Sequence, residues 1–266
     1  MLEKHVESER SKIELVKKYV TGGRLLEIGP SYGGFSYLAM KEGFDVQAIE
    51  MDSDCCAYLN EVVGVKCINT SGTADDIFAV LQELEPFQVI TLWHVIEHLP
   101  DPLPILKALS AKLSPGGILV LAAPNPEGIE YKLFGKFWVH LDAPRHLYLI
   151  TMSTMKACLK RFELEQVLIS CRTDTDIALN NFGWFWISLE HLLKNVLLGK
   201  EQFISSSQTK GSYTSAMQSK KKKQFRPILR LFMGLCHLFY SLVIMPLAAI
   251  EGRGNSYTAV FKKPSQ

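Results

Sequence analysis

Residues 24–52, RLLEIGPSYGGFSYLAMKEGFDVQAIEMD, decide the fold of this chain. The apolar run at 24–28 predicts a short strand that Gly29 ends, residues 33–42 predict a helix, and residues 45–50 predict a second strand. A strand, a glycine-containing loop, a helix and another strand in this order are typical of a parallel sheet with helices packed on it.

The loop between the first strand and the helix has the composition of a nucleoside-binding turn. Gly29 and Gly33 let the backbone turn sharply and approach a ligand without a Cβ in the way. The helix that follows directs free N–H groups at such a ligand. Glu50, at the end of the second strand, is placed to accept hydrogen bonds from two ribose hydroxyls. The alternative is a strand–helix connection that binds no ligand, and the position of the Glu50 carboxylate makes this alternative the weaker interpretation.

Two cofactors use a site of this kind. A dinucleotide needs its pyrophosphate held on the helix N-terminus, usually through three glycines, and here Pro30 and Ser31 occupy the middle of the loop. S-adenosylmethionine has no phosphate and needs only close approach for its methionine end and its ribose. The sequence therefore fits S-adenosylmethionine better.

The rest of the chain extends the alternation of strands and helices. Further strands are predicted at 65–69, 87–92, 118–123, 164–171 and 256–262. Helices are predicted between most of them, and Asp101 is expected to cap the one that begins at Pro102. This pattern predicts a parallel sheet with helices on both faces.

Composition narrows the class of protein. The chain has 266 residues, 47% of them hydrophobic and 21% charged, and a net charge of +2. These values exclude a disordered chain or a coiled coil, and they give no electrostatic case for nucleic acid as a partner. The six cysteines lack zinc-ligand spacing, so no metal is expected and a reduced, cytoplasmic protein is the simplest interpretation. Residues 1–20 are charged throughout and lack the apolar core of a signal peptide.

Seven blocks carry a resemblance to a known family. They are LLEIGPSYGGF, AIEMD, GTADDI, FQVITLWHVIEHLPDP, LSPGGILVLAAPNP, FWVHLDAPRHLYLITMSTM and GRGNSYTAVFKK. Taken in this order, the chain resembles the class I S-adenosylmethionine-dependent methyltransferases, in particular their ubiquinone-biosynthesis O-methyltransferase branch. The resemblance implies an α/β, Rossmann-like seven-stranded sheet whose last strand is antiparallel. It implies a methyltransferase domain over 1–180 and 251–266, interrupted by a helical insertion at 181–250.

The resemblance also implies roles for single residues. Glu27, Gly29 and Gly33 would lie beside the methionine moiety of the cofactor, and Glu50 would hold its ribose. The adenine would contact Met51, Ala74 and Asp75, although Asp75 is equally suited to the first turn of a helix. Trp93 and His94 would face both cofactor and substrate.

Histidines supply the candidate catalytic groups. His140 and His146 lie in the segment after the fifth predicted strand, near the edge where parallel sheets bind ligands. We expect one of them to act as a base or to contact the substrate, and the alternative is a structural role in the loop. The run 94–98, HVIEH, also matches the HxxEH pattern of zinc peptidases. It follows a strand and is cut off by Pro100, which argues against a zinc site.

The insertion is unusually apolar. Residues 184–198 are rich in aromatic and aliphatic side chains, residues 201–223 are polar and predict a linker, and 231–250 contains no Asp, Glu, Lys or Arg. The last run just reaches the length that spans a bilayer. Three interpretations stay open: a soluble lid, a helix in the membrane interface recruited by basic residues within 220–250, and a true span.

The sequence therefore predicts an enzyme that transfers a methyl group from S-adenosylmethionine to a small-molecule, lipid or lipid-linked glycan acceptor, at oxygen. The alternatives are an NAD(P)-dependent oxidoreductase on a similar fold and a non-catalytic cofactor-binding module. The predicted location is cytoplasmic with a membrane-associated surface as an option, and the sequence does not indicate an oligomeric state.

Overall fold

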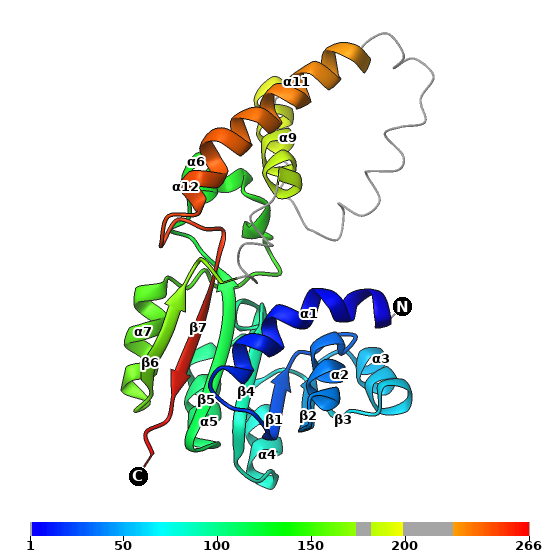
Figure 1. Ribbon diagram of the computed structural model, residues 1–266, viewed down its shortest axis with the longest axis vertical. Coiled ribbons are helices and arrows are strands. Elements are labelled where there is room, and N and C mark those ends of the chain that lie inside the picture. The colour runs from blue at the N-terminus through cyan, green and yellow to red at the C-terminus, as the bar shows by residue number, and fades with distance from the viewer. Residues whose placement is uncertain (1, 174–181, 199–225, 266) are drawn as a thin grey trace. The chain divides into compact units, whose positions relative to one another are not determined.

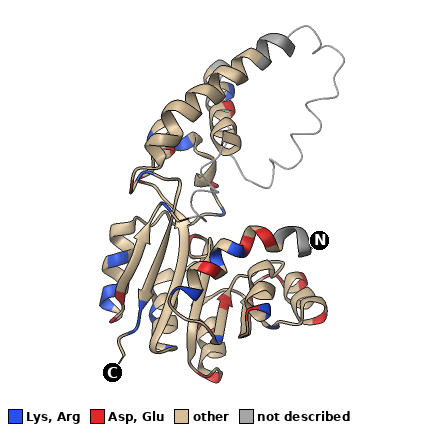
Figure 2. Cartoon of the chain, viewed as in Figure 1, with Lys and Arg blue, Asp and Glu red and all other residues tan. Residues whose placement is uncertain are grey.

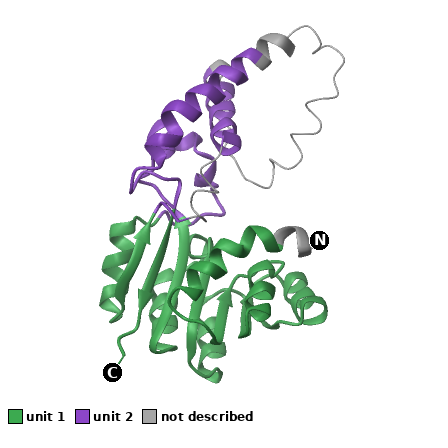
Figure 3. Ribbon diagram, in the orientation of Figure 1, with its two compact units in different colours: residues 1–123, 150–170, 257–266 green, residues 124–149, 171–256 purple. Residues whose placement is uncertain are grey.

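The computed structural model describes residues 2–173, 182–198 and 226–265. The chain divides into two compact units (Figure 3). The first unit contains Met1–Ala123, Ile150–Ser170 and Tyr257–Gln266, and the second contains Pro124–Leu149 and Cys171–Ser256. The predicted linker at 201–223 lies outside the described residues. The predicted insertion at 181–250 falls within the second unit, which also takes in 124–149.

The first unit is built on a seven-stranded sheet (Figure 1). Its strands are β1 (Gly23–Ile28), β2 (Phe44–Glu50), β3 (Lys66–Asn69), β4 (Phe87–Trp93), β5 (Leu113–Pro124), β6 (Glu165–Ser170) and β7 (Ser256–Lys262). They follow the spatial order β3-β2-β1-β4-β5-β7-β6. The strands from β3 to β5 pair in parallel, whereas β7 runs antiparallel to β6. The predicted Rossmann-like sheet with an antiparallel last strand is confirmed.

The order of the strands fixes where a ligand binds. From β1 the chain proceeds to β2 and β3 on one side, and then returns to place β4 on the other side of β1. In open parallel sheets, ligands bind beyond the carboxyl ends of the strands at this reversal point. The residues at the ends of β1, β2 and β4 therefore line the expected ligand site.

Helices cover both faces of the sheet (Figure 1). On one face, α1 (Leu2–Lys17), α2 (Gly34–Lys41) and α3 (Ser53–Tyr58), with the π-turn η1 (Leu59–Val63), share a core with alternate residues of the strands. The intervening strand residues, such as Leu26 and Ile90, are also fully buried and point to the other face, because side chains alternate along a strand. There α5 (Pro102–Ala111) packs against α4 (Ala74–Glu83) and α7 (Met152–Arg161).

Two local predictions differ from the structure. The fifth strand begins at Leu113 rather than at 118, because Leu113 pairs with Phe87 and the pairing resumes at Val89 and Ile118 after a bulge. The side chain of Asp101 makes no capping hydrogen bond, so the proline at the first position is what favours the start of α5.

The second unit is helical and has its own aromatic core. Its elements are α6 (Ile129–Phe134), the short helices η3 (Gly135–Phe137) and η4 (Val139–Leu141), α9 (Phe182–Leu198), α11 (Arg226–Phe239), η7 (Tyr240–Ile244) and α12 (Met245–Ala248). The core residues are Phe134, Trp138, Phe185, Tyr240 and Ile244. Its edge contacts, such as that between the Phe134 and Phe185 rings at 5.2 Å, are the favoured geometry for aromatic pairs.

Gly33 provides a test of the packing around the glycine loop. It has φ +72°, and a Cβ there would overlap Leu59 Cδ2, so the space next to Gly33 is filled by packing rather than left open for a ligand. We expect Gly33→Ala to lower the free energy of unfolding by about 1–3 kcal/mol in urea titrations. Gly22→Ala is the control, because nothing lies within 4 Å of its added Cβ. Equal stability of the two variants would contradict this account.

Candidate functional site

The loop after β1 is held by hydrogen bonds to its own backbone and to β2. Gly29, Ser31 and Gly33 have φ values of +67°, +52° and +72°. The N–H of Gly29 donates to the carbonyl of Ile49 at 2.8 Å, and the N–H of Gly33 donates to that of Pro30 at 2.9 Å. Ser31 is a non-glycine residue in the left-handed region, which costs free energy unless contacts stabilise it.

Glu50 supplies that contact. It is 6% exposed, and its Oε2 accepts the N–H of Ser31 at 2.8 Å. Its Oε1 accepts the N–H groups of Met51 at 2.8 Å and Asp52 at 3.0 Å. A carboxylate has about four acceptor positions, so one remains for a ligand hydroxyl while the other three join the ends of β1 and β2.

This arrangement bears on the choice of cofactor. A pyrophosphate bound at this loop would need free N–H donors. The N–H groups of Gly29, Ser31 and Gly33 already have acceptors, and the Ser31 N–H faces a carboxylate that would repel a phosphate. The loop therefore fits a nucleoside without phosphate, as predicted from its sequence.

Glu27 is buried near the end of β1, the strand that pairs with β2. It is 3% exposed, and the hydroxyl of Ser36 in α2 donates to it. Burial raises the pKa of Glu27 to about 7, and its hydrogen bond with Ser36 and the charge of Lys12 oppose the rise. A cationic group placed beside Glu27 would favour its ionised form.

Lys12 is a residue that the sequence analysis does not single out. It lies in α1, with its Nζ 5.1 Å from the centre of the Trp93 ring and 2.6 Å from a Glu9 carboxylate oxygen. Helix α1 therefore reaches the carboxyl end of β4. The helical pattern of residues 3–20 contains the signal, because Lys12 is one turn before the buried Val16 and so borders the buried face.

The end of β4 presents polar atoms that lack partners. Thr91 Oγ1, Trp93 Nε1 and His94 Nε2 are buried and make no hydrogen bond with the described residues. Buried polar groups in folded proteins nearly always bind a partner, so these atoms point to a ligand or ordered water. Thr91 lies next to Glu27, since β1 pairs with β4 through these two residues.

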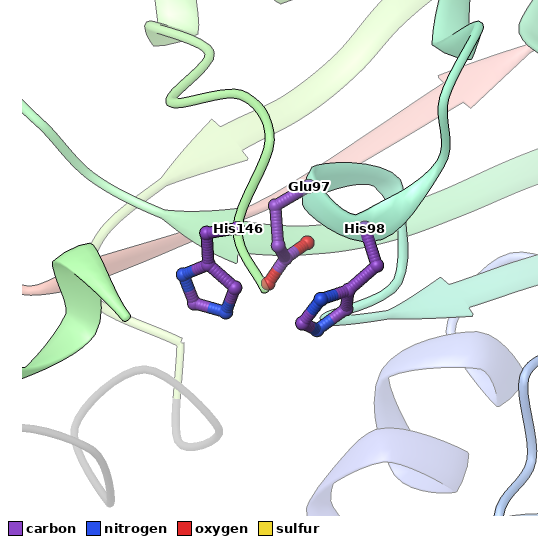
Figure 4. Close-up of side chains that lie close together, drawn as sticks. All are labelled: Glu97, His98 and His146. Carbon is purple, nitrogen blue, oxygen red and sulfur yellow. The ribbon is translucent and has the colours of Figure 1, made fainter. Parts of the chain in front are cut away.

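His94 does not form the zinc-peptidase arrangement that its HxxEH motif imitates. It has φ +56°, and its Nδ1 lies 3.5 Å from Glu97 Oε1. Glu97 and His98 lie on a single 3-10 turn, η2 (Ile96–His98), as Figure 4 shows. The motif thus lacks the continuous helix that would bring both of its histidines to one face.

The residues expected near an adenine follow β2 and β3. The Met51 side chain lies against Gly72, where a Cβ would overlap its sulfur. Thr73 caps α4 through the N–H of Asp76 at 3.4 Å. Asp75 and Ala74 follow this cap in the first turn of α4, and Asp75 is exposed.

The histidine loop belongs to the second unit and is ordered by its own contacts. His146, labelled in Figure 4, has its Nδ1 2.8 Å from the carbonyl oxygen of His140. Because a carbonyl only accepts, Nδ1 carries the proton and the lone pair of the neutral ring is on Nε2. That Nε2 lies 3.9 Å from Asp142, which Arg145 also binds.

The His140 ring lies between two tryptophans. The ring centres of Trp138 and Trp184 are 5.3 Å and 5.2 Å from it. The two predicted catalytic residues thus differ in setting: His146 has a defined tautomer beside a carboxylate, and His140 is packed among aromatic rings. His146 is the better candidate for a base.

Comparison with known proteins identifies the family of the chain. Residues 5–169 match the model of a family described as methyltransferase domain. A ubiquinone biosynthesis O-methyltransferase of Coxiella burnetii is 24% identical over 116 residues, which cover 43% of this chain and 50% of the relative. The chain thus spans about half the length of this curated relative.

Two solved structures share the fold. A SAM-dependent methyltransferase from Archaeoglobus fulgidus has a TM-score of 0.56 and 18% identity, with 99% of this chain and 95% of the other covered. A phosphoethanolamine N-methyltransferase 2 from Haemonchus contortus, in complex with phosphomonomethylethanolamine and S-adenosylhomocysteine, has a TM-score of 0.55 and 16% identity. That comparison covers 96% of this chain and 52% of the other.

The raised pKa of Glu27 predicts a pH-dependent stability. The unfolded chain releases this proton near its ordinary value of 4.5, whereas the folded protein keeps it up to about pH 7. The folded state therefore binds more protons in this window, and the free energy of unfolding falls as the pH rises through it.

We expect Glu27→Gln to remove this fall. Between about pH 5 and pH 8, the variant should gain about 2–3 kcal/mol relative to the wild type in urea titrations, because the amide never ionises. Glu61→Gln, at an exposed site, is the control and should keep the wild-type pH profile. Parallel curves for wild type and Glu27→Gln would show that Glu27 is not protonated in the folded protein.

Proposed function

The chain belongs to the methyltransferase domain family and carries a class I S-adenosylmethionine-dependent methyltransferase domain, and from this premise we propose that it methylates an oxygen of a small, lipid-like or lipid-linked acceptor. The observation that carries the proposal is the group of buried polar side chains at the carboxyl ends of β1, β2 and β4. Their hydrogen-bond partners, their charges and the acceptor position that remains on Glu50 suit a cationic nucleoside rather than a dinucleotide.

Each part of this edge has a role toward the cofactor. Glu50 keeps one acceptor position for a ribose hydroxyl. Glu27 would take the amino end of the methionine moiety, where a positive charge offsets the cost of ionising a buried carboxylate. Trp93 and His94 would contact the sulfonium end of the cofactor. Met51, Ala74 and Asp75 would contact its adenine.

The chemistry that remains for the protein is alignment and proton removal. S-adenosylmethionine, when bound, supplies a methyl group that its sulfonium has already activated. His146 would accept the proton of the acceptor hydroxyl at Nε2, since Nδ1 is held by the His140 carbonyl. The segment that carries His146 follows β5 along the chain, after α6, η3 and η4.

The nature of the acceptor rests on two observations. Trp138 and Trp184 flank His140, a setting that suits an apolar or aromatic acceptor. The curated relative is by its name an O-methyltransferase of ubiquinone biosynthesis, which supports oxygen as the methylated atom. Such an acceptor fits a cytoplasmic enzyme working beside a membrane.

Calorimetry and labelling test the proposal together. S-adenosylhomocysteine should bind the pure protein, and NAD should give no heat. Incubation with S-adenosylmethionine labelled in its methyl group should then label a lipid-soluble fraction of cell extract at a base-stable ether. Binding of NAD would favour an oxidoreductase, and cofactor binding with no labelled fraction would favour a non-catalytic module.

Glu50→Gln should weaken the binding of the cofactor. Loss of the charge-assisted hydrogen bonds to loop and ribose is expected to lower the affinity for S-adenosylhomocysteine by about tenfold to a hundredfold in calorimetry. Asp54→Asn, an exposed acid four residues further along, should bind as the wild type does. Unchanged affinity in a folded Glu50→Gln variant would remove Glu50 from the site.

His146→Gln should slow methyl transfer without weakening the binding of the cofactor. Removal of a general base typically costs about 10²–10⁴-fold in kcat. His191→Gln, on α9, is the control. A variant that keeps the wild-type rate would show that His146 is a structural residue of the loop.

A further inference from the structure

The helical run from α11 through η7 to α12 has an exposed apolar face. Its residues recur every three or four positions and so lie along one side of the helix. They are Leu231, Leu235, Leu238, Leu242 and Met245, which are 67%, 57%, 53%, 68% and 52% exposed. We call these five residues the outer face.

The opposite side of the same helix is also apolar, but it is buried in the second unit. Tyr240, Ile244 and Ala248 follow one another at four-residue spacing and are at most 3% exposed. The Tyr240 ring packs on Phe185 of α9 at 5.1 Å and on Phe182 at 5.8 Å. The packing of the second unit therefore uses one face of the helix and leaves the outer face uncovered by the described residues.

An exposed row of leucines is a feature of binding surfaces. Single apolar residues are common on protein surfaces, whereas contiguous apolar patches mark sites that contact another molecule or a membrane. Figure 2 shows no charged residue along the part of this helix that it colours, and the sequence has none from 231 to 250. The partner must therefore be largely apolar where it contacts the outer face.

The charge of the surrounding sequence indicates which partner. From residue 202 to residue 250 the chain contains no Asp or Glu, but it contains Lys210, Lys220–Lys223, Arg226 and Arg230. A basic segment followed by an apolar helix face matches the interface of an anionic membrane, with headgroups outside and acyl chains within. We propose that the outer face binds the surface of an anionic phospholipid bilayer, with the helix lying in the plane of the interface.

A transmembrane arrangement fits less well, although Leu231–Ala248 is long enough and apolar enough to cross a bilayer. Strands β6 and β7 precede and follow the insertion and pair with each other, so both ends lie on the same side of any membrane. The chain would then have to cross an even number of times. The other long apolar helix described, α9, carries the Glu190–Lys194 ion pair at 2.6 Å and is poorly suited to a span.

A second copy of the chain is also a weaker occupant than lipid. In a symmetric dimer the same patch meets itself, so each copy would offer the other the same basic residues. No acidic residue within 202–250 of either copy is available to pair with them. An anionic membrane surface supplies the opposite charge that a second copy of this segment lacks.

Vesicle flotation of the full chain tests the proposal. We expect the wild type to float with vesicles of phosphatidylcholine and phosphatidylglycerol, and to float less with phosphatidylcholine alone or at high salt. Leu235→Glu with Leu242→Glu should lower the bound fraction on anionic vesicles about tenfold or more, because two charges would enter the apolar layer. Both sites are exposed, so the variant should fold, as circular dichroism and S-adenosylhomocysteine binding would verify.

The matched control is Val62→Glu, an apolar residue of the first unit that is 65% exposed. It should float as the wild type does. Three results would overturn the proposal. The first is equal flotation of the double variant and the wild type, and the second is protein that resists extraction by alkaline carbonate, as a membrane-spanning protein does. The third is a dimer that forms without lipid and that the double substitution dissociates, while no form of the protein floats. None of these depends on methyl transfer, so the proposal stands or falls separately from the proposed function.

Discussion

The loop after β1 and the turn after β2 depend on one carboxylate. Glu50 accepts three backbone N–H groups, one from the loop after β1 and two from the turn after β2. These bonds stabilise Ser31 in a left-handed conformation that a non-glycine residue adopts only with support. They also use the N–H that a phosphate would need. The same interaction therefore shapes the loop and selects the kind of nucleoside that the loop accepts.

The sequence predicts the parts of this site that are local in the chain. The prediction of Gly29, Gly33 and Glu50 needs only the turn after one strand and the end of the next strand. The structure places these three residues at the reversal point of the sheet. The strand pattern is predicted for the same reason, since continuous apolar runs between turns identify buried strands.

Other features depend on contacts between distant segments, and a local pattern does not identify the residue at the other end of each contact. Lys12 over Trp93 joins α1 to β4, and the fit of Leu59 beside Gly33 joins η1 to the loop. The early start of β5 at Leu113 depends on its pairing with Phe87 across a bulge. The assignment of 124–149 to the second unit depends on aromatic packing of Trp138 and Phe134 with α9, which a pattern of spacing does not reveal.

The antiparallel pairing of β6 with β7 has a consequence for how such a protein diversifies. Residues 171–256 leave the sheet after Ser170 and return at β7, where Ser170 pairs with Thr258. Because the two ends of this excursion are fixed side by side, its length and content can change at little cost in chain entropy to the sheet. Evolution is thus able to exchange the segment between β6 and β7 while the sheet itself is inherited unaltered.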